Sequence, residues 1–263
     1  MRLVERATAE PAPDLVIFPE TALRLPFHMI PPEIIKKLVE KNKNIIISSY
    51  WQVDRGVLLD QTNTSYSTRL TYLNENVPWK RDKSHLVPFG EYVPPGFNWL
   101  VKMLRIPSFE LVEGPKNQNN LVVGNVELAF NICFELVFPS QWRSQGASSN
   151  LIVNSSNIAW YGKDVSQKMH FIFSRARALE FQKPFVSVTN SGNTMHLSQT
   201  AEVIDVAKHN SEEILHVKVQ PFTGRTPYSI FGDWIIIGFL LSSAPLLAAY
   251  RFLQPKVRIF LNS

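Results

Sequence analysis

Four short apolar runs constrain the fold of this 263-residue chain more than any other feature. They span residues 14–18, 44–50, 150–154 and 184–189. Each run is short and apolar nearly throughout, which is typical of a strand that is buried on both faces. Stretches with helical spacing lie between and beside them, at residues 32–43, 139–145 and 166–181. This alternation predicts an α/β fold built in layers.

Weaker patterns fill in the remaining elements. Residues 121–130 predict a hairpin about Gly124-Asn125, because this dipeptide favours a tight turn. Residues 62–73 indicate strands about a turn, and residues 77–81 lead into a proline-rich loop at 83–97. We also expect the end of a helix, a turn and a late strand, at residues 3–10, 190–193 and 213–220. Hydrophobic residues make up 45% of the chain, which is enough for one sizeable domain but leaves little room for a second.

The C-terminal part of the sequence has a different composition. Trp234 to Tyr250 is a run of 17 residues without a charge, and its apolar flanks extend it to residues 228–253. That length approaches the ~20 residues that cross a bilayer, so we expect a transmembrane helix here. The alternative is a buried helix of a globular core. If the segment crosses the membrane, Arg251 and the basic tail at 254–263 would lie in the cytoplasm, and residues 1–227 would lie outside it.

Charge excludes several classes of partner. The formal net charge is +5, but the basic residues are scattered and form no long block. No zinc-ligand spacing, aromatic RNA-binding pattern or phosphate-binding glycine loop is present. The first residues are charged and do not form a signal peptide. We therefore expect no metal, no cofactor and no nucleic acid, whereas an anionic membrane surface fits the mild positive charge.

Cys133 is the only cysteine in the chain, so it cannot form an intrachain disulfide. Its ordinary role would be that of a small buried side chain. A nucleophilic role needs a base and a cation, and Glu20 and Lys83 occur where such groups gather, near the ends of apolar runs. Glu91 could orient the lysine. Each residue alone also has a structural explanation, so spacing by itself leaves both interpretations open.

Several motifs together carry a resemblance to a known family. They lie at residues 18–22, 83–94, 132–135, 157–162, 175–180, 189–192 and 224–228. The chain resembles the nitrilase, or carbon–nitrogen hydrolase, superfamily, which works through a Glu-Lys-Cys triad. The run Lys-Ser-His-Leu-Val-Pro-Phe-Gly-Glu-Tyr-Val-Pro at 83–94 is similar more narrowly to the apolipoprotein N-acyltransferases. The likeness extends from about residue 14 to about residue 250.

The resemblance implies an α-β-β-α sandwich over residues 1–227 and a role for each matching residue. Glu20 would be the general base, Lys83 the cation that stabilises an oxyanion and Cys133 the nucleophile. Glu91 and Glu135 would support the site, and Phe134, Trp160 and Tyr161 would contact the substrate. The implied reaction moves an acyl chain from a phospholipid, through a Cys133 thioester, to the α-amine of the diacylglyceryl-cysteine of a lipoprotein. The implied location is the periplasmic side of the bacterial inner membrane.

The resemblance also implies that the chain is N-terminally truncated. The first strand of the family and its bundle of membrane helices have no counterpart here, so a separate polypeptide could supply those helices. Two alternative functions remain. One is a soluble amidase that shares the triad. The other is an inactive truncated relative, suggested by Phe134 and Ile158, which replace the tyrosine and aspartate usual in the family.

Overall fold

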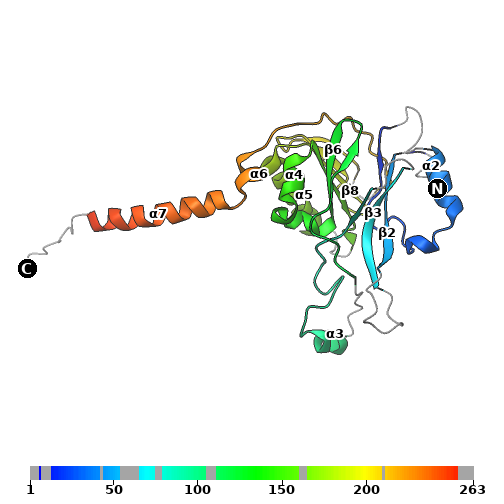
Figure 1. Cartoon of the computed structure of the whole chain (residues 1–263), viewed down its shortest axis with the longest axis horizontal. Coiled ribbons are helices and arrows are strands. Elements are labelled where there is room, and N and C mark those ends of the chain that lie inside the picture. Colours follow the sequence, from blue (N-terminus) through cyan, green and yellow to red (C-terminus); the bar gives the residue numbers. More distant parts are fainter. Residues whose placement is uncertain are drawn as a thin grey trace, which may run out of the picture.

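Two β-sheets packed face to face form the centre of the protein, with helices on both outer faces (Figure 1). The computed structural model describes residues 6, 13–41, 44–53, 65–74, 79–104, 111–159, 165–208 and 211–253. Helix α2 (Pro32–Lys41) covers one sheet, and helices α4 (Pro139–Ser148) and α5 (Val165–Phe181) cover the other. The predicted layered α/β fold is therefore confirmed.

The first sheet has the strand order β1-β2-β3-β4. Its strands are β1 (Val16–Ile17), β2 (Ile45–Val53), β3 (Ser65–Leu73) and β4 (Trp79–Asp82). Strand β1 is parallel to β2, whereas β2, β3 and β4 are antiparallel to one another. The expected turn within 62–73 is wrong for the described part, because β3 is continuous and pairs with β2 along its whole length. Strand β4 lies where the sequence indicated only the approach to a loop.

The second sheet has the order β10-β9-β8-β7-β6-β5. Its strands are β5 (Leu121–Val123), β6 (Val126–Ile132), β7 (Leu151–Ser156), β8 (Phe185–Thr189), β9 (Met195–Leu197) and β10 (Val203–Val206). Strands β6, β7 and β8 are parallel, so their carboxyl ends meet at one edge of the sheet. The predicted hairpin at Gly124-Asn125 is confirmed.

The late strand expected at residues 213–220 is wrong, since no strand is assigned there. The stretch that follows, residues 222–224, is instead held by a few individual hydrogen bonds. The Phe222 amide donates to the Asn150 carbonyl at 3.1 Å. The Lys183 ammonium donates to the carbonyls of Phe222 and Gly224, at 2.8 and 2.9 Å. A buried cation therefore replaces a backbone ladder as the attachment of this segment.

The packing explains why the short runs are apolar throughout. Ile45 and Ile47 of β2 pack toward α2, whereas Ile46 between them packs in the core between the sheets. In the same way, Val153 of β7 lies between the sheets, and Ile152 packs with Phe181 of α5. Most described positions in these strands are buried, because each sheet is covered on both faces.

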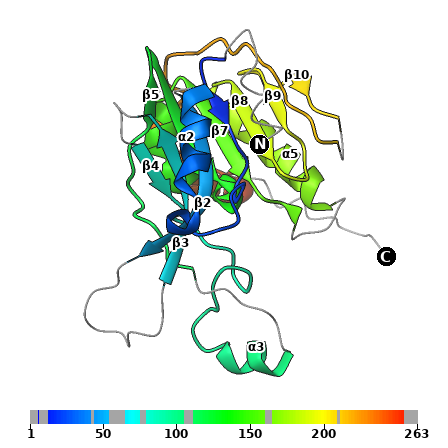
Figure 2. The same ribbon diagram turned by 90° about the vertical axis from the view of Figure 1, so that its right-hand side faces the viewer.

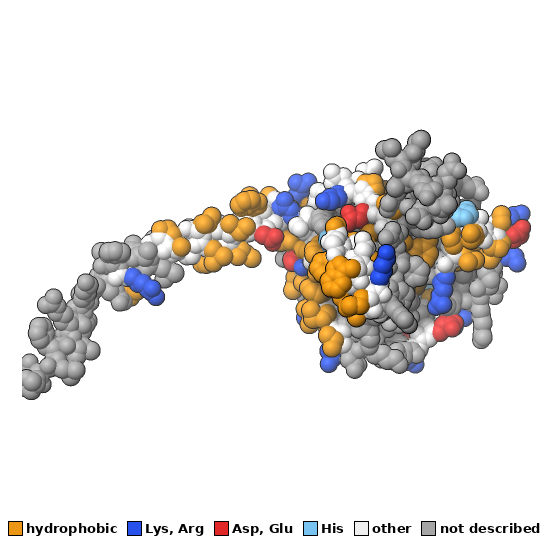
Figure 3. All heavy atoms as spheres, turned by 90° about the horizontal axis from the view of Figure 1, so that it is seen from below, with side chains coloured by type: hydrophobic (Ala, Val, Ile, Leu, Met, Phe, Trp, Pro, Cys, Tyr) orange, Lys and Arg blue, Asp and Glu red, His pale blue; other side chains and the backbone are white. Residues whose placement is uncertain are grey.

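Helix α3 (Asn98–Leu104) follows the loop at 83–97 and projects from the body (Figures 1 and 2). Most of its apolar side chains are exposed, including Trp99 at 62% and Met103 at 63%. The sequence indicated only a loop before this point. Figure 3, viewed from below, shows hydrophobic side chains gathered on the face where α3 lies.

The C-terminal apolar segment forms two helices rather than the single one expected at 228–253. Helix α6 (Pro227–Phe231) ends at Gly232, which has a φ of +60° that favours glycine, and α7 (Trp234–Leu253) begins two residues later. Helix α7 extends away from the body (Figure 1), and hydrophobic side chains are exposed along it (Figure 3). Within the described residues, no helix combines the length and hydropathy needed to cross a membrane. The tail at 254–263 lies outside the described residues, as does the expected helix end at 3–10 except for residue 6.

Candidate active site

Strand ends from both sheets bring Glu20, Lys83 and Cys133 to one region. Glu20 follows β1 by three residues, and Lys83 comes directly after β4. Cys133 comes directly after β6 in the second sheet. Asn157, directly after β7, joins the two sheets, because its amide donates to Glu20 Oε2 at 2.8 Å and its side chain donates to Thr21 Oγ1 at 2.8 Å. The site therefore lies between the sheets at the carboxyl ends of their strands.

A buried lysine between two carboxylates forms the centre of the site. Lys83 is 0% exposed, and its Nζ lies 2.9 Å from Glu20 Oε1 and 2.5 Å from Glu91 Oε1. The second oxygen of Glu91 accepts from the Val87 amide at 2.9 Å. Both carboxylates are thus held by the lysine on one oxygen and by a backbone amide on the other. Such paired geometry is what makes a buried charge cluster tolerable.

The charges in this cluster set the protonation states. Burial alone would lower the pKa of Lys83, but the nearby acidic groups, Glu20 foremost and then Cys133 and Glu91, outweigh burial and hold its pKa well above the usual range. Burial also raises the pKa of Glu20, against the opposing effect of Lys83. The lysine is therefore a permanent cation, and the carboxylate has a raised affinity for a proton, as a general base requires.

Cys133 has an unusual backbone conformation. It begins the 3-10 helix η2 (Cys133–Val137) with a φ of +49°, a left-handed value that costs a non-glycine residue about 1–2 kcal/mol. Its Sγ lies 3.7 Å from the Asn157 carbonyl oxygen. Burial and then the nearby Glu20 raise the pKa of the thiol, and Lys83 only partly opposes them. The resting site thus holds a neutral thiol, which needs a base to react.

Glu135 holds the start of η2, where Cys133 lies, against the strand end that carries Lys83. Its Oε1 accepts from the Ser84 amide at 2.6 Å and from the Ser84 hydroxyl at 2.7 Å. Its Oε2 accepts from the Ile132 amide at 2.7 Å and lies 3.6 Å from the Arg81 guanidinium. Because Ser84 follows Lys83 and Ile132 precedes Cys133, one buried carboxylate fixes two site residues. Glu135 therefore ties the start of η2 to the end of β4.

The predicted substrate-contacting residues are described only in part. Phe134 is half-buried, and its ring lies 5.1 Å from that of Phe138 and 5.7 Å from that of His85. Trp160 and Tyr161 lie outside the described residues. Phe134 thus belongs to a small aromatic group beside Cys133.

Ile158, on the loop after β7, is buried at 4% exposure. Its backbone amide donates to Asn190 Oδ1 at 3.2 Å. Its side chain packs so closely on Gly192 that a Cβ there would lie 2.9 Å from Ile158 Cγ1. The loop after β7 therefore accommodates the apolar side chain within the core between the sheets.

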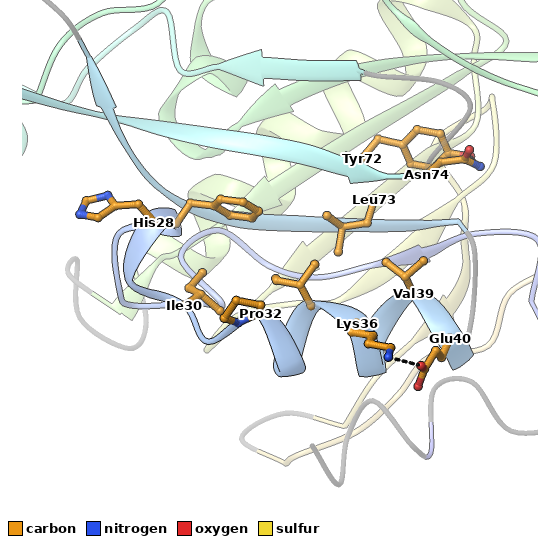
Figure 4. A pocket seen from close by; sticks show the side chains of 11 residues that line it. His28, Ile30, Pro32, Lys36, Val39, Glu40, Tyr72, Leu73 and Asn74 are labelled. Carbon is orange, nitrogen blue, oxygen red and sulfur yellow. Dashed lines mark hydrogen bonds and ion pairs between the residues drawn. The ribbon is translucent and has the colours of Figure 1, made fainter.

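A separate hollow of about 950 Å³ lies between α2 and the first sheet (Figure 4). Apolar side chains such as Ile30, Val39 and Leu73 face it, and Lys36 and Glu40 form an ion pair on α2 beside it. None of the three strand-end residues lines this hollow. The chemistry and this hollow therefore lie on different faces of the first sheet.

Several polar residues close to Cys133 were not among the site residues predicted from the sequence. Asn154 and His170 form a buried hydrogen-bonded group behind the start of η2, and Asn157 bonds to Glu20. The signal for Asn154 was present, since it is a polar residue near the end of an apolar run, as Glu20 is. In the part of the chain that the structure describes, no group of three or more His, Cys, Asp or Glu side chains is arranged to hold a metal ion.

The fold defines the class of protein. It is similar to a carbon–nitrogen hydrolase from Helicobacter pylori, with a TM-score of 0.56 over 80% of this chain and 79% of that one, at 14% identity. It is equally similar to the NitFhit protein of Caenorhabditis elegans, with a TM-score of 0.56 over 79% of this chain and 53% of that one, at 17% identity. Both comparisons define a nitrilase-like α/β sandwich.

Sequence comparison gives the family. Residues 1–228 match the carbon–nitrogen hydrolase family, and the chain belongs to it. It is 34% identical to the apolipoprotein N-acyltransferase of Neisseria meningitidis serogroup A, over 90% of this chain and 48% of that protein. It is 30% identical to that of Nitrosomonas europaea, over 94% of this chain and 50% of that protein. The chain thus spans about half the length of the curated relatives it matches.

Proposed function

We propose that the chain is the catalytic part of an N-acyltransferase that acts on lipoproteins. The observation that carries this proposal is the buried Glu20–Lys83–Glu91 cluster beside Cys133, in a chain 34% identical to apolipoprotein N-acyltransferases. The proposed donor is a phospholipid, and the proposed acceptor is the α-amine of an N-terminal diacylglyceryl-cysteine. The carboxylate, lysine and thiol supply the base, the oxyanion partner and the nucleophile that acyl transfer needs.

In the first half-reaction, Cys133 attacks the ester carbonyl of the phospholipid. Glu20 takes the thiol proton as the Sγ–C bond forms, which its raised pKa favours. The developing oxyanion is stabilised by the Lys83 ammonium, whose own raised pKa keeps it charged. The ester C–O bond then breaks, and Glu20 returns the proton to the leaving alkoxide. The products are a lysophospholipid and a Cys133 thioester.

In the second half-reaction, the lipoprotein amine attacks the thioester carbonyl. Glu20 removes a proton from the attacking nitrogen, and Lys83 again faces the oxyanion. The C–S bond breaks, the amide forms, and the proton passes to the Cys133 sulfur. Each carboxylate and the lysine return to their starting protonation states, so no cofactor is required by the proposed chemistry.

The proposed location is the outer face of the bacterial inner membrane. The exposed apolar side chains of α7 and α3 support this, because isolated apolar surface of this extent is typical of contact with lipid or with protein. Residues 1–227 would form the catalytic domain, 228–253 the membrane anchor and 254–263 a cytoplasmic tail. A separate polypeptide with membrane helices is a further proposed partner.

Incubation of the detergent-solubilised chain with a radiolabelled phospholipid tests the proposal. We expect label on the protein that hydroxylamine releases, as a thioester does, and no label on Cys133→Ala. Addition of a diacylated lipopeptide should discharge the label to the lipopeptide amine. The Neisseria relative, run in parallel, controls for the assay. Absence of label on this chain alone would refute the proposal and favour an inactive relative. Turnover of small amides without phospholipid would favour an amidase.

A further inference from the structure

The face of α5 that packs against the second sheet is unusually polar. Its buried positions include Gln167, His170, Ser174 and Arg177, whereas a helix on a sheet normally presents apolar residues. The Gln167 amide donates to the Ser191 carbonyl at 2.8 Å, and the Ser174 hydroxyl donates to the His170 carbonyl at 2.8 Å. The His170 imidazole instead reaches across to the strands that carry the site.

Asn154 of β7 is the centre of the group that His170 joins. Its Oδ1 lies 2.8 Å from His170 Nε2 and also accepts from the Ser156 hydroxyl, whose oxygen lies 3.1 Å from the same Nε2. Its Nδ2 donates to Asn131 Oδ1 and, at 3.4 Å in each case, to the backbone carbonyl oxygens of Asn131 and Cys133. All four side chains are buried, with exposures of 0% for Asn131, Asn154 and Ser156 and 7% for His170. The Asn154 amide thus uses both its donors and both its acceptor positions.

These contacts fix which way the Asn154 amide points. Burial lowers the pKa of His170 to about 4, so the imidazole is neutral near pH 7 and can donate one proton. With that proton on Nε2, His170 and Ser156 both donate to Asn154 Oδ1. The opposite end of the amide, Nδ2, must then face Asn131 and the Cys133 carbonyl. A reversed amide would set its NH₂ group against the Nε2 proton of His170.

We propose that His170 and Asn154 are positioning residues, which hold the Cys133 carbonyl and thereby the left-handed conformation of the nucleophile. The +49° φ at Cys133 is disfavoured for a side-chain-bearing residue, so it persists only where surrounding contacts hold it. The Asn154 donor supplies such a contact, and His170 orients that donor. The inference rests on the proposed function only in taking Cys133 as the nucleophile.

Two nearly isosteric variants separate the hydrogen bond from the packing. His170→Gln keeps a donor near the place of Nε2, whereas His170→Met has a similar length and no donor. Ser174→Ala is the matched control, because it removes another buried hydrogen bond on the same helix without touching Asn154. Ser156→Ala, which removes the second donor to Asn154 Oδ1, is the reserve variant if His170→Met does not fold.

Cys133 is the only cysteine, so ¹³C-cysteine labelling gives one Cα signal whose shift reports its backbone conformation. We expect that signal to move in His170→Met and in Ser156→Ala, and to stay in place in His170→Gln and Ser174→Ala. Thioester formation should fall at least about tenfold in His170→Met, and His170→Gln should restore most of it. An unmoved signal in His170→Met, or an equal shift in Ser174→Ala, would overturn the inference. If the native chain forms no thioester, the proposed function fails, while the Cα signal still decides the positioning role.

Discussion

At the scale of single residues, Lys83 determines the character of the site. Among the described residues, it forms ion pairs with both Glu20 and Glu91, and it is fully buried. Without it, two carboxylates would face each other away from water. One of them would have to take up a proton, because two close buried carboxylates do not both ionise readily.

Replacement of this lysine should therefore destabilise the fold as well as abolish thioester formation. We expect Lys83→Met to lower the free energy of unfolding at pH 7 by about 3–5 kcal/mol, the usual cost of removing one partner from a buried ion pair. Urea unfolding measures this change. The matched control is Lys80→Met, on the same strand but exposed, which should change stability by less than about 0.5 kcal/mol. Equal losses in the two variants would contradict this account of Lys83.

His170 makes a prediction about pH. Its pKa is about 4 in the folded protein and 6.5 in the unfolded chain, so the unfolded state binds more protons between these values. The stabilisation is present above pH 6.5 and is lost as the pH falls, by about 3 kcal/mol at pH 4. Comparison of urea unfolding for the native chain and His170→Gln from pH 7.5 to 4 should show this difference in slope. Ser174→Ala, which removes a buried but non-titratable side chain from the same helix, should leave the slope unchanged.

The site residues that the sequence pointed to lie beside recognisable local patterns. Glu20 and Cys133 follow apolar runs, so the strands that place them could be read directly, and Lys83 opens a distinctive loop. His170 lies within a helix, where only the packing of α5 on the sheet decides that its side chain is buried. Nothing in the local pattern separates it from an exposed helical histidine.

At the scale of elements, strand β4 shows how a misread segment can still place a functional residue. The strand is only four residues long, and its apolar and polar residues do not alternate strongly, so the sequence did not reveal it. Its register is nevertheless fixed by pairing with β3 and by the ion pair between Arg69 and Asp82. Tertiary pairing, rather than local preference, makes this segment a strand. The short strands β9 and β10 were missed for the same reason.

Gly114 packs against the end of β4 and hydrogen-bonds to the residue that follows it. Its amide donates to the Lys83 carbonyl at 2.8 Å, and a Cβ at this position would lie 3.0 Å from the Asp82 carbonyl carbon. We expect Gly114→Ala to cost about 1–3 kcal/mol, because the backbone of Asp82 must move, and to slow thioester formation with it. Thermal unfolding and acylation of the same samples test this. Gly238→Ala on α7, which meets nothing within 4 Å, should lose neither.

At the scale of the whole molecule, a compact sandwich carries an apolar helix that stands away from it. Helix α7 contacts α6 rather than the sheets, so it adds little to the core. Its first side chain, Trp234, is 71% exposed, and Phe239 is 70% exposed. The sequence predicted this separation from its abrupt change in composition, but it did not reveal the break at Gly232.

Removal of α7 should therefore abolish membrane binding without affecting the folding of the body. We expect a chain that ends at Asp233 to keep the unfolding temperature of the body within about 3 °C and to lose co-sedimentation with anionic phospholipid vesicles. The full chain should sediment with the vesicles. A double variant of α3, Trp99→Ser with Met103→Ser, serves as the control for apolar surface on the body and should retain binding through α7. Loss of folding on truncation would contradict the view of α7 as an appendage.

At the proposed location outside the cytoplasm, the raised pKa of the Cys133 thiol would affect how long the thiol survives. Peroxides and disulfides attack the thiolate far faster than the thiol, and a lone cysteine has no neighbour to reverse its oxidation by forming an intrachain disulfide. Because its pKa is raised, the Cys133 thiol stays protonated between turnovers and resists such oxidation. Glu20, held 2.9 Å from Lys83, can take the proton once a substrate carbonyl is in place. The same burial that slows the free thiol would thus preserve the enzyme in an oxidising compartment.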